Sequence, residues 1–219
     1  MAREEIRAFY DRFGTRQDRQ GFYEDAATRD LVAHAGFEEA RAVFEFGCGT
    51  GRFAEGLLAH RLPEGAVYTG CDLSSTMIDL ARGRLKPFGD RVHIELTEGA
   101  VRLDKPGAAF DRFVSNYVLD LLPGEDITLL LQEAHRMLTA DGRLCLVSLT
   151  HGTTLLSRFV SQLWTRVHSW RPSLVGGCRP IELQDFVLQR AWKVEYRNVV
   201  VASGIPSEIT VARKRPLVG

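Results

Sequence analysis

Short apolar runs and segments of helical periodicity alternate along most of the chain. The apolar runs, rich in β-branched and aromatic residues, predict strands at 42–46, 66–71, 92–96, 110–115 and 143–149. The periodic segments between them predict helices at 52–60, 74–85 and 127–138. Because these strands are apolar on both faces, the pattern predicts a parallel sheet covered by helices on two sides.

The two ends of the chain follow other patterns. Within the first 40 residues, apolar side chains recur at helical spacing and predict helices. Near the other end, two strands at 192–201 and 207–212 are separated by a short link at 203–206, which predicts an antiparallel hairpin. We therefore expect one α/β domain with a mostly parallel, seven-stranded sheet and a helical insertion at 150–180.

Charge is distributed unevenly along the 219 residues, although the net charge is zero. Residues 1–150 have 18 basic and 24 acidic side chains, whereas residues 151–219 have 10 basic and 4 acidic ones. The even total argues against a dedicated nucleic-acid coat, which would show a basic excess. The segment 151–181 contains no acid and has aromatic residues interleaved with Arg158, Arg166, Arg171 and Arg179.

The cysteine pattern and the N-terminal residues bear on the cellular compartment of the protein. The four cysteines form no CxxC pair, so we expect neither a disulfide framework nor a metal site. The N-terminus has acids where a signal peptide needs an apolar stretch, and no apolar run approaches the length of a membrane span. We expect a soluble, cytoplasmic protein with no integral membrane association.

A glycine-rich turn follows the first predicted strand and opens a helix, in the sequence Glu45-Phe46-Gly47-Cys48-Gly49-Thr50-Gly51. Such a turn lets the backbone approach a ligand closely and offers free N–H donors, which is typical of nucleotide binding. The dinucleotide fingerprint would need a glycine at Arg52, and the lysine of a phosphate-binding P-loop is absent. The turn therefore lacks the pyrophosphate version of the motif.

Asp72 ends the second predicted strand. A carboxylate at this position can accept hydrogen bonds from both hydroxyls of a ribose. The alternative is a helix cap ahead of Ser74 and Ser75. The position of Asp72 at the end of the strand favours the ribose interpretation.

Three motifs in register give the chain a family resemblance. Glu45-x-Gly47-x-Gly49-x-Gly51 is followed by Gly70-x-Asp72-x-Ser74-x-x-Met77, and then by Phe110-Asp111-x-x-x-Ser115-Asn116-x-x-Leu119. Over roughly residues 40–150 the sequence resembles the class I S-adenosylmethionine-dependent methyltransferases. Tyr10-Asp11-Arg12 resembles the lead-in of their small-molecule branch, which includes ubiquinone, menaquinone and bacterial phosphatidylethanolamine N-methyltransferases. The resemblance implies a Rossmann-like, doubly wound sheet with an antiparallel C-terminal hairpin.

The resemblance also implies roles for individual residues. The glycine turn would wrap the methionine part of S-adenosylmethionine, Glu45 would help hold its ammonium group, and Asp72 would take the ribose hydroxyls. The adenine would contact Leu73 and Met77, with Glu98 or the backbone of Gly99 or Ala100 at its amino group. Core packing is the alternative for Met77, and a solvated surface position is the alternative for Glu98. The implied cofactor-binding set is Glu45, Gly47, Cys48, Gly49, Gly51, Asp72, Leu73, Met77, Glu98, Gly99, Asn116 and Tyr117.

Other residues are candidates for binding the methyl acceptor. Tyr10 and Tyr23 are candidates for closing over the site, with ordinary packing as the alternative, and Asn116 and Tyr117 would meet the incoming acceptor. His151 and His168 are candidate bases, while Asp120 stands where relatives often have histidine. Arg179 is the candidate acceptor-side charge, because arginines near an apolar pocket suit a carboxylate or phosphate. A solvated amphipathic helix is the alternative for the basic segment.

These features predict methyl transfer to a small-molecule acceptor, anionic or lipid-like, within a single domain. Its parts would be an N-terminal helical lid (1–40), a cofactor-binding core (41–150), a helical acceptor cover (151–180) and a C-terminal helix and hairpin (181–219). Two alternatives remain open, a cofactor-binding but inactive partner protein and a macromolecule methyltransferase. No nucleic-acid partner is expected, because no recognition domain or Asn/Asp-Pro-Pro-Tyr signature is visible.

Overall fold

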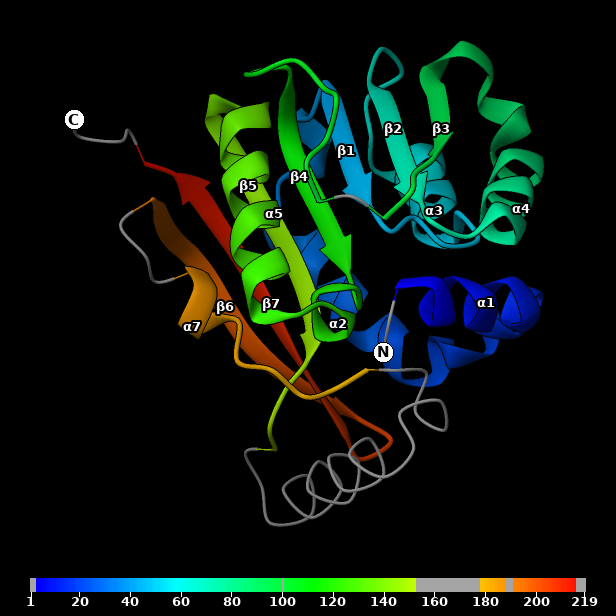
Figure 1. The fold of residues 1–219 in the computed structure, drawn as a ribbon. Helices are drawn as coiled ribbons and strands as arrows, with labels where there is room; N and C mark the ends of the chain where they lie inside the picture. Colours follow the sequence, from blue (N-terminus) through cyan, green and yellow to red (C-terminus); the bar gives the residue numbers. More distant parts are fainter. Residues whose placement is uncertain (1–2, 100, 153–177, 188–190, 216–219) are drawn as a thin grey trace.

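The computed structural model describes residues 3–99, 101–152, 178–187 and 191–215. Seven strands form one sheet in the order β3-β2-β1-β4-β5-β7-β6. The first five are parallel to one another, whereas β7 is antiparallel to both β5 and β6 (Figure 1). The strands are β1 (Ala42–Phe46), β2 (Val67–Asp72), β3 (Val92–Leu96), β4 (Phe110–Asn116), β5 (Leu138–Leu149), β6 (Trp192–Ala202) and β7 (Ile205–Lys214). The Rossmann-like fold with an antiparallel C-terminal hairpin is confirmed.

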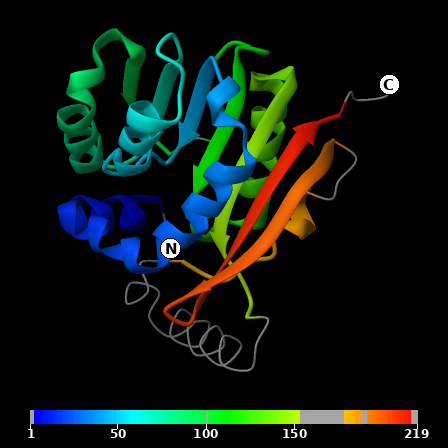
Figure 2. The same ribbon diagram turned by 180° about the vertical axis from the view of Figure 1, so that it is seen from behind.

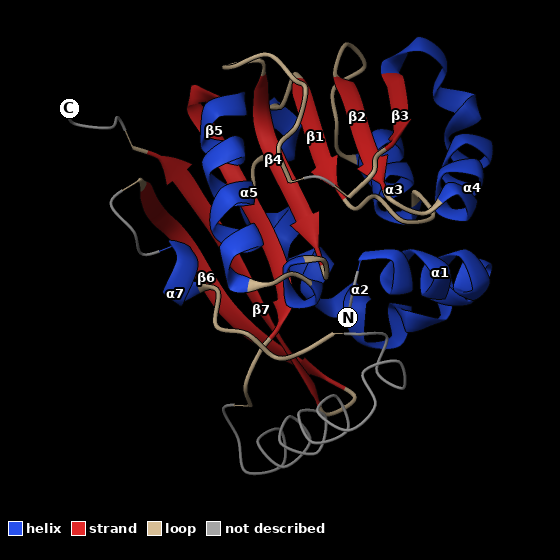
Figure 3. Cartoon of the chain, in the orientation of Figure 1, coloured by secondary structure: helices blue, strands red, loops and turns tan. Residues whose placement is uncertain are grey.

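Helices cover both faces of the sheet (Figure 3). They are α1 (Arg3–Phe13), α2 (Gly21–His34), α3 (Arg52–His60), α4 (Ser75–Leu85), α5 (Gly124–Met137) and the short α7 (Gln184–Val187). In Figure 1, α5 and α7 lie in front of the sheet, and Figure 2 shows α2 and α3 on the opposite face. The two sides of the sheet are therefore buried separately, as the doubly apolar strands require.

Successive side chains along a strand pack on opposite faces of the sheet, so the hydrophobic core has two layers. On β1, Val43 packs in the α2/α3 layer and Phe44 in the α5/α7 layer. On β4, Val114 and Phe113 divide in the same way. Successive strand side chains point to opposite faces, so one buried strand serves both layers.

Most predicted element boundaries agree with the structure to within a residue or two. Two elements begin earlier than predicted. The helix α5 begins at Gly124, three residues before the predicted start. The strand β5 begins at Leu138 and runs through the predicted turn at Asp141-Gly142. The hairpin link is only Ser203-Gly204, both at positive φ, rather than four residues. Left-handed residue pairs match the twist of a tight hairpin, which extends β6 and β7 toward each other.

The helical insertion predicted for 150–180 falls mostly outside the described residues, as do Ala100, His168 and the arginines at 158, 166 and 171. Among the described residues, no helix is both long and apolar enough to cross a membrane. No disulfide joins any of the four cysteines, all of which lie in described segments.

The N-terminal helix α1 lies near the carboxyl ends of the parallel strands. Figure 1 shows α1 below the lower ends of α3 and α4, beside the edge of the sheet at which β1 and β2 end. Ser74 Oγ donates a hydrogen bond to Asp11 Oδ1 at 2.6 Å, which ties α1 to the start of α4. Since ligands of open α/β sheets bind outside the carboxyl ends of the strands, α1 covers the region where a site is expected.

Candidate functional site

The glycine turn joins β1 to α3 at this edge of the sheet. Gly47, Gly49 and Gly51 all have positive φ angles, of 80°, 51° and 76°. The N–H of Gly47 donates to the carbonyl of Cys71 at 2.8 Å, which ties the turn to the end of β2. A Cβ on Gly47 would stand 2.3 Å from Cγ2 of Val118, so glycine is needed for the turn to pass the loop after β4.

Asp72 lies beside the turn and is partly buried. Its Oδ2 accepts from the N–H of Gly49 and its Oδ1 from the N–H of Ser74, both at 2.9 Å. Burial raises the pKa of Asp72, and the backbone hydrogen bonds oppose that shift. Ser74 is the N-cap of α4, since its Oγ accepts from the N–H of Met77. Each oxygen of Asp72 therefore keeps a lone pair for a further donor.

Glu45 is a fully buried acid on β1. Its Oε2 accepts from the hydroxyl of Tyr68, and its Oε1 accepts from Nδ2 of Asn116 at 3.2 Å. Burial raises the pKa of Glu45 to about 7, against the lowering effect of these two donors. Oδ1 of Asn116 is buried and has no hydrogen-bond partner among the described residues. An orphaned acceptor beside a buried carboxylate suits a ligand that donates hydrogen bonds and has positive charge.

Tyr117 adopts a left-handed backbone conformation, with φ 55°, at the carboxyl end of β4. Its N–H donates to the carbonyl of Val147 at 2.8 Å, and its hydroxyl donates to Ser207 Oγ at 2.9 Å. Its ring meets that of Tyr23 edge to face, with the centroids 5.6 Å apart. Such a conformation is unfavourable for a bulky residue and is found where surrounding contacts fix it, often at functional sites.

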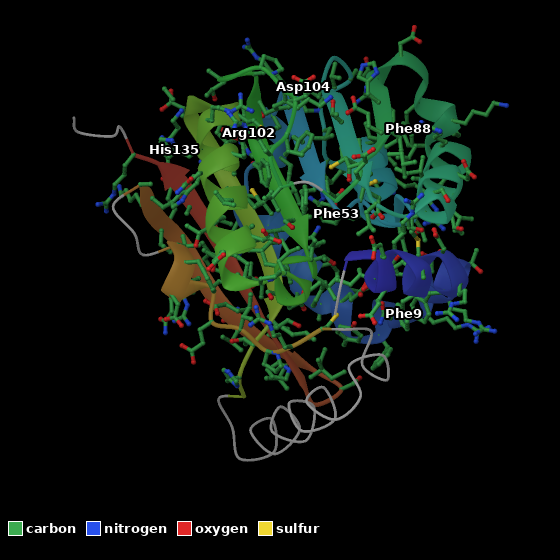
Figure 4. All side chains as sticks on the ribbon, viewed as in Figure 1. Phe9, Phe53, Phe88, Arg102, Asp104 and His135 are labelled. Atoms are coloured by element: carbon green, nitrogen blue, oxygen red, sulfur yellow. The ribbon has the colours of Figure 1, made fainter. Side chains whose placement is uncertain are left out.

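Two cavities meet at the glycine turn. The larger, of about 500 Å³, lies between the turn, α2 and α3. Phe53 on α3, which is labelled in Figure 4, is one of its lining residues. The smaller, of about 80 Å³, is lined in part by residues of α1. Gln17, Gly47, Asn116 and Tyr117 line both cavities, so the two cavities adjoin each other at these residues. Oε1 of Gln17 is a second buried acceptor that lacks a partner within the described structure.

Most of the sequence-predicted residues line this site. The structure places there Tyr10, Glu45, Gly47, Cys48, Asp72, Leu73, Gly99, Asn116 and Tyr117. Gly49 and Gly51 shape the turn without lining either cavity. Tyr23 is buried behind Tyr117.

Four predicted residues lie elsewhere. Met77 is buried in the core and lines neither cavity, as its packing alternative predicted. Glu98 and His151 are exposed and also lie outside both walls, while Thr97 and Gly99 occupy the wall near Glu98. Arg179 is close to the site, but its guanidinium donates to the carbonyl of Leu122. A role for Arg179 in binding the acceptor stays a prediction that would require this contact to break.

The N-terminal segment is fastened to the glycine turn through an ion pair. Nη2 of Arg84 and Oδ2 of Asp18 are 2.6 Å apart. The same guanidinium donates to the carbonyl of Thr50 at 3.1 Å, and Thr50 Oγ1 donates to Asp18 Oδ1 at 2.6 Å. Burial raises the pKa of Asp18, but the bonds from Arg84 and Thr50 outweigh that effect and lower it. The segment around Asp18 is thus anchored to the glycine turn.

Sequence reasoning did not anticipate several residues of the site. Gln17, Asp18, Glu24 and Arg52 all line the larger cavity. Arg52 pairs with Asp25 at 2.7 Å and with Glu24 at 3.6 Å. These residues stand in helical or polar stretches whose local pattern resembles a solvated surface, so only the folding of α1 and α2 over the turn brings them to the site.

Part of the chain is similar in sequence to known methyltransferases. A protein family described as "Methyltransferase domain" matches residues 44–144. A trans-aconitate 2-methyltransferase from Azoarcus sp. is 33% identical over 55% of this chain and 44% of its own length. A 2-methyl-6-phytyl-1,4-hydroquinone methyltransferase from Oryza sativa is 32% identical over 72% of this chain and 45% of its own length. The chain thus spans less than half the length of these two curated relatives.

Solved structures show the same fold. A chain of the complex between the Haloferax volcanii Trm112 methyltransferase activator and its methyltransferase superposes with a TM-score of 0.75, at 14% identity, over 98% of this chain and 99% of that one. An S-adenosylmethionine-dependent methyltransferase from Methanosarcina mazei gives a TM-score of 0.64, at 17% identity, over 84% and 96% of the two chains. The family match covers residues 44–144 and these structures share the fold, so the chain is similar in sequence and in fold to S-adenosylmethionine-dependent methyltransferases. The cofactor of that class is S-adenosylmethionine.

The residues present fit this cofactor. A glycine cradle that a Cβ would fill lies next to a partly buried carboxylate with free lone pairs, Asp72. At the other side of the turn, Glu45 and the orphaned Oδ1 of Asn116 suit an ammonium group. The acids around the cavities also suit a cationic sulfonium, since opposite charge stabilises a cation in a site of low dielectric constant.

Proposed function

We propose that this chain transfers a methyl group from S-adenosylmethionine to a small-molecule acceptor. The single observation behind the proposal is the grouping of Asp72, Glu45 and the unpartnered Asn116 Oδ1 around one glycine turn, in the walls of two adjoining cavities. A dinucleotide site would need a glycine at position 52, where Arg52 instead pairs with acids of α2.

S-adenosylmethionine, when bound, supplies an electrophilic methyl group on a sulfonium. Asp72 would accept hydrogen bonds from the ribose hydroxyls, while Glu45 and Asn116 would hold the ammonium. Tyr117, fixed by Ser207 and Val147, would shape the face that the acceptor approaches. The helices α1 and α2 would exclude water, which leaves alignment as the main contribution of this chain to the reaction.

The printed names of the two curated relatives support a small-molecule acceptor, since one names an organic acid and the other a hydroquinone with a lipid-like chain. An anionic or lipid-like acceptor therefore stays within the proposal. The parts predicted from the sequence, a lid at 1–40, a core at 41–150, an acceptor cover at 151–180 and a C-terminal hairpin, belong to the same proposal. We also place the protein in the cytoplasm, in keeping with four cysteines and no disulfide.

Calorimetric titration with S-adenosylmethionine and with NADH tests the cofactor. We expect saturable binding of S-adenosylmethionine and none of NADH, and the opposite pattern would refute the proposal. A panel of amines, phenols, quinols, carboxylates and phospholipids, scored by release of S-adenosylhomocysteine, then tests turnover. Tight cofactor binding with no turnover on any acceptor would support the inactive-partner alternative instead.

A further inference from the structure

A cluster of tyrosines and buried carboxyl groups adjoins the place where the two cavities meet. Tyr10 comes from α1, Tyr23 and Glu24 from α2, and Tyr117 and Asp120 from the end of β4 and the turn after it. Tyr10 and Tyr117 line the smaller cavity, and Glu24 and Tyr117 line the larger one. The helices α1 and α2 and the chain after β4 therefore form an acidic and aromatic cluster beside the glycine turn, and Tyr10, Glu24 and Tyr117 of this cluster line the cavities.

Asp120 lies next to this cluster. It is fully buried next to Leu121, which lines the smaller cavity. Its Oδ2 accepts from the N–H of Leu149 at 3.3 Å, while its Oδ1 has no hydrogen-bond partner among the described residues. Its charge is near enough to raise the pKa of the three tyrosines and of Glu24. A buried carboxyl with an open acceptor position is incomplete without a donor.

Glu24 is the carboxyl that faces the cavity. Burial raises its pKa to about 7, and Asp25 and Asp120 add to that rise, while Arg52 and the hydroxyl of Tyr23 oppose it. Arg52 lies closer to Asp25, at 2.7 Å, than to Glu24, at 3.6 Å. Burial likewise raises the pKa of Asp120 to about 7. Backbone hydrogen bonds oppose this rise, and the positive charge of Arg179 opposes it more weakly. Both carboxyl groups can therefore change protonation near neutral pH.

This arrangement matches one chemical class of acceptor. Tyrosine faces attract cations through their quadrupoles, and carboxylates attract them through charge. An ammonium ion, however, has no lone pair and cannot attack a methyl group, so an amine acceptor needs a group that removes its proton. A carboxyl group with a pKa near 7, set among tyrosines, can both bind the ammonium and accept that proton.

We infer that the methyl acceptor is an amine, which enters as an ammonium ion and gives its proton to Glu24, with Asp120 as the second negative charge. This inference rests on the proposed function. The N–H bond of the ammonium breaks, its proton goes to a Glu24 oxygen, and the electron pair stays on nitrogen. That pair forms the new N–C bond as the S–C bond breaks and its pair returns to sulfur, so the positive charge moves from sulfur to nitrogen. Asp120 is a positioning residue, because it is fully buried and lines neither cavity.

Matched probes separate this acceptor class from the others. The chain, saturated with S-adenosylhomocysteine, is titrated with phenethylamine, 2-phenylethanol and 3-phenylpropionate, and with octylamine, octanol and octanoate. We expect each amine to bind at least tenfold more tightly than its alcohol or carboxylate counterpart. Amines that bind no better than their counterparts, or that do not bind, overturn the inference. Failure of S-adenosylhomocysteine to bind would instead overturn the proposed function.

Three variants test which residues cause the preference for amines. Glu24→Gln and Asp120→Asn should each reduce the preference for amine over alcohol by at least fivefold, with affinity for S-adenosylhomocysteine within a few-fold of the wild type. Glu64→Gln, an exposed acid on the loop before β2, should change nothing and serves as the matched control. If Asp120→Asn does not fold, Glu24→Gln alone decides, since its side chain is part of the cavity wall. An unchanged preference in Glu24→Gln refutes the inference.

Discussion

The backbone N–H of Gly49 donates a hydrogen bond to Oδ2 of Asp72 at 2.9 Å, across 23 residues of sequence. The glycine turn and the acid at the end of β2 are therefore built as one unit. Their alignment follows from the parallel pairing of β1 and β2, in which Phe46 lies opposite Cys71. The carboxylate holds the turn in place and keeps lone pairs for a ligand.

Replacement of Asp72 by alanine should weaken S-adenosylmethionine binding by about 1–3 kcal/mol, as for loss of a charged hydrogen-bond acceptor. The N–H groups of Gly49 and Ser74 would also lose their acceptor, which loosens the turn. Calorimetry with S-adenosylhomocysteine measures the effect. Asp79→Ala, an exposed acid on α4, is the control and should bind normally. Equal affinity in the two variants would show that the ribose assignment is wrong.

Alanine at Gly47 should destabilise the protein and abolish tight cofactor binding. Its φ of 80° costs an L-residue about 1–2 kcal/mol, and the new Cβ would press on Val118. Gly83 lies in α4, and a Cβ there meets nothing within 4 Å. Gly83→Ala should therefore stabilise the protein by about 0.5–1 kcal/mol. Urea unfolding of both variants checks the opposite signs, and a neutral Gly47→Ala would contradict the close approach.

Loss of the Asp18–Arg84 contact should free the lid. Asp18→Asn removes a partly exposed ion pair, so we expect only about 1 kcal/mol of global destabilisation. Hydrogen exchange in residues 3–20 should rise much more than exchange in β1 or β4, and S-adenosylhomocysteine should dissociate faster. Asp90→Asn, an exposed acid before β3, is the control. Uniform exchange changes across the chain would indicate general destabilisation rather than lid release.

The pattern of apolar residues was enough to predict the strands and helices from β1 to β3, because apolar runs and helical periodicity reflect burial directly. The same local signal failed for the start of β5, where Leu138 pairs with Phe110 but the ladders with β4 and β7 run only from Arg143 onward. The glycine turn and Asp72 could be predicted because each follows a strand. Helical spacing, however, could not decide whether Met77 faces the core or a ligand.

The rest of the site depends on contacts between distant segments. Asp18 meets Arg84 across 66 residues, and Glu24 reaches the cavity only because α2 packs beside the glycine turn. No spacing rule connects such residues in a single sequence. The buried position of Asp120 was equally hidden, since a lone acid in a loop normally lies in solvent.

Glu45 should make stability depend on pH. Its pKa in the folded state is raised from 4.5 to about 7 by burial, so the native protein binds a proton that the unfolded chain has released. The contribution of this group to stability is therefore fully present below pH 4.5 and is lost as the pH rises toward 7. Tyr68, Asn116 and Asp72 face this carboxyl group, and Tyr68 and Asn116 limit the shift.

Glu45→Gln removes that titration while keeping hydrogen-bonding atoms toward Tyr68 and Asn116. The free energy of unfolding of the variant, relative to the wild type, should increase between pH 4.5 and 7. Glu64→Gln should show no such trend, because that acid is exposed. Urea titrations at pH 4.5, 5.5, 6.5 and 7.5 measure the difference, and parallel pH profiles for wild type and Glu45→Gln would contradict the prediction. Bound S-adenosylhomocysteine, whose ammonium favours ionised Glu45, should reduce the dependence in the wild type and not in the variant.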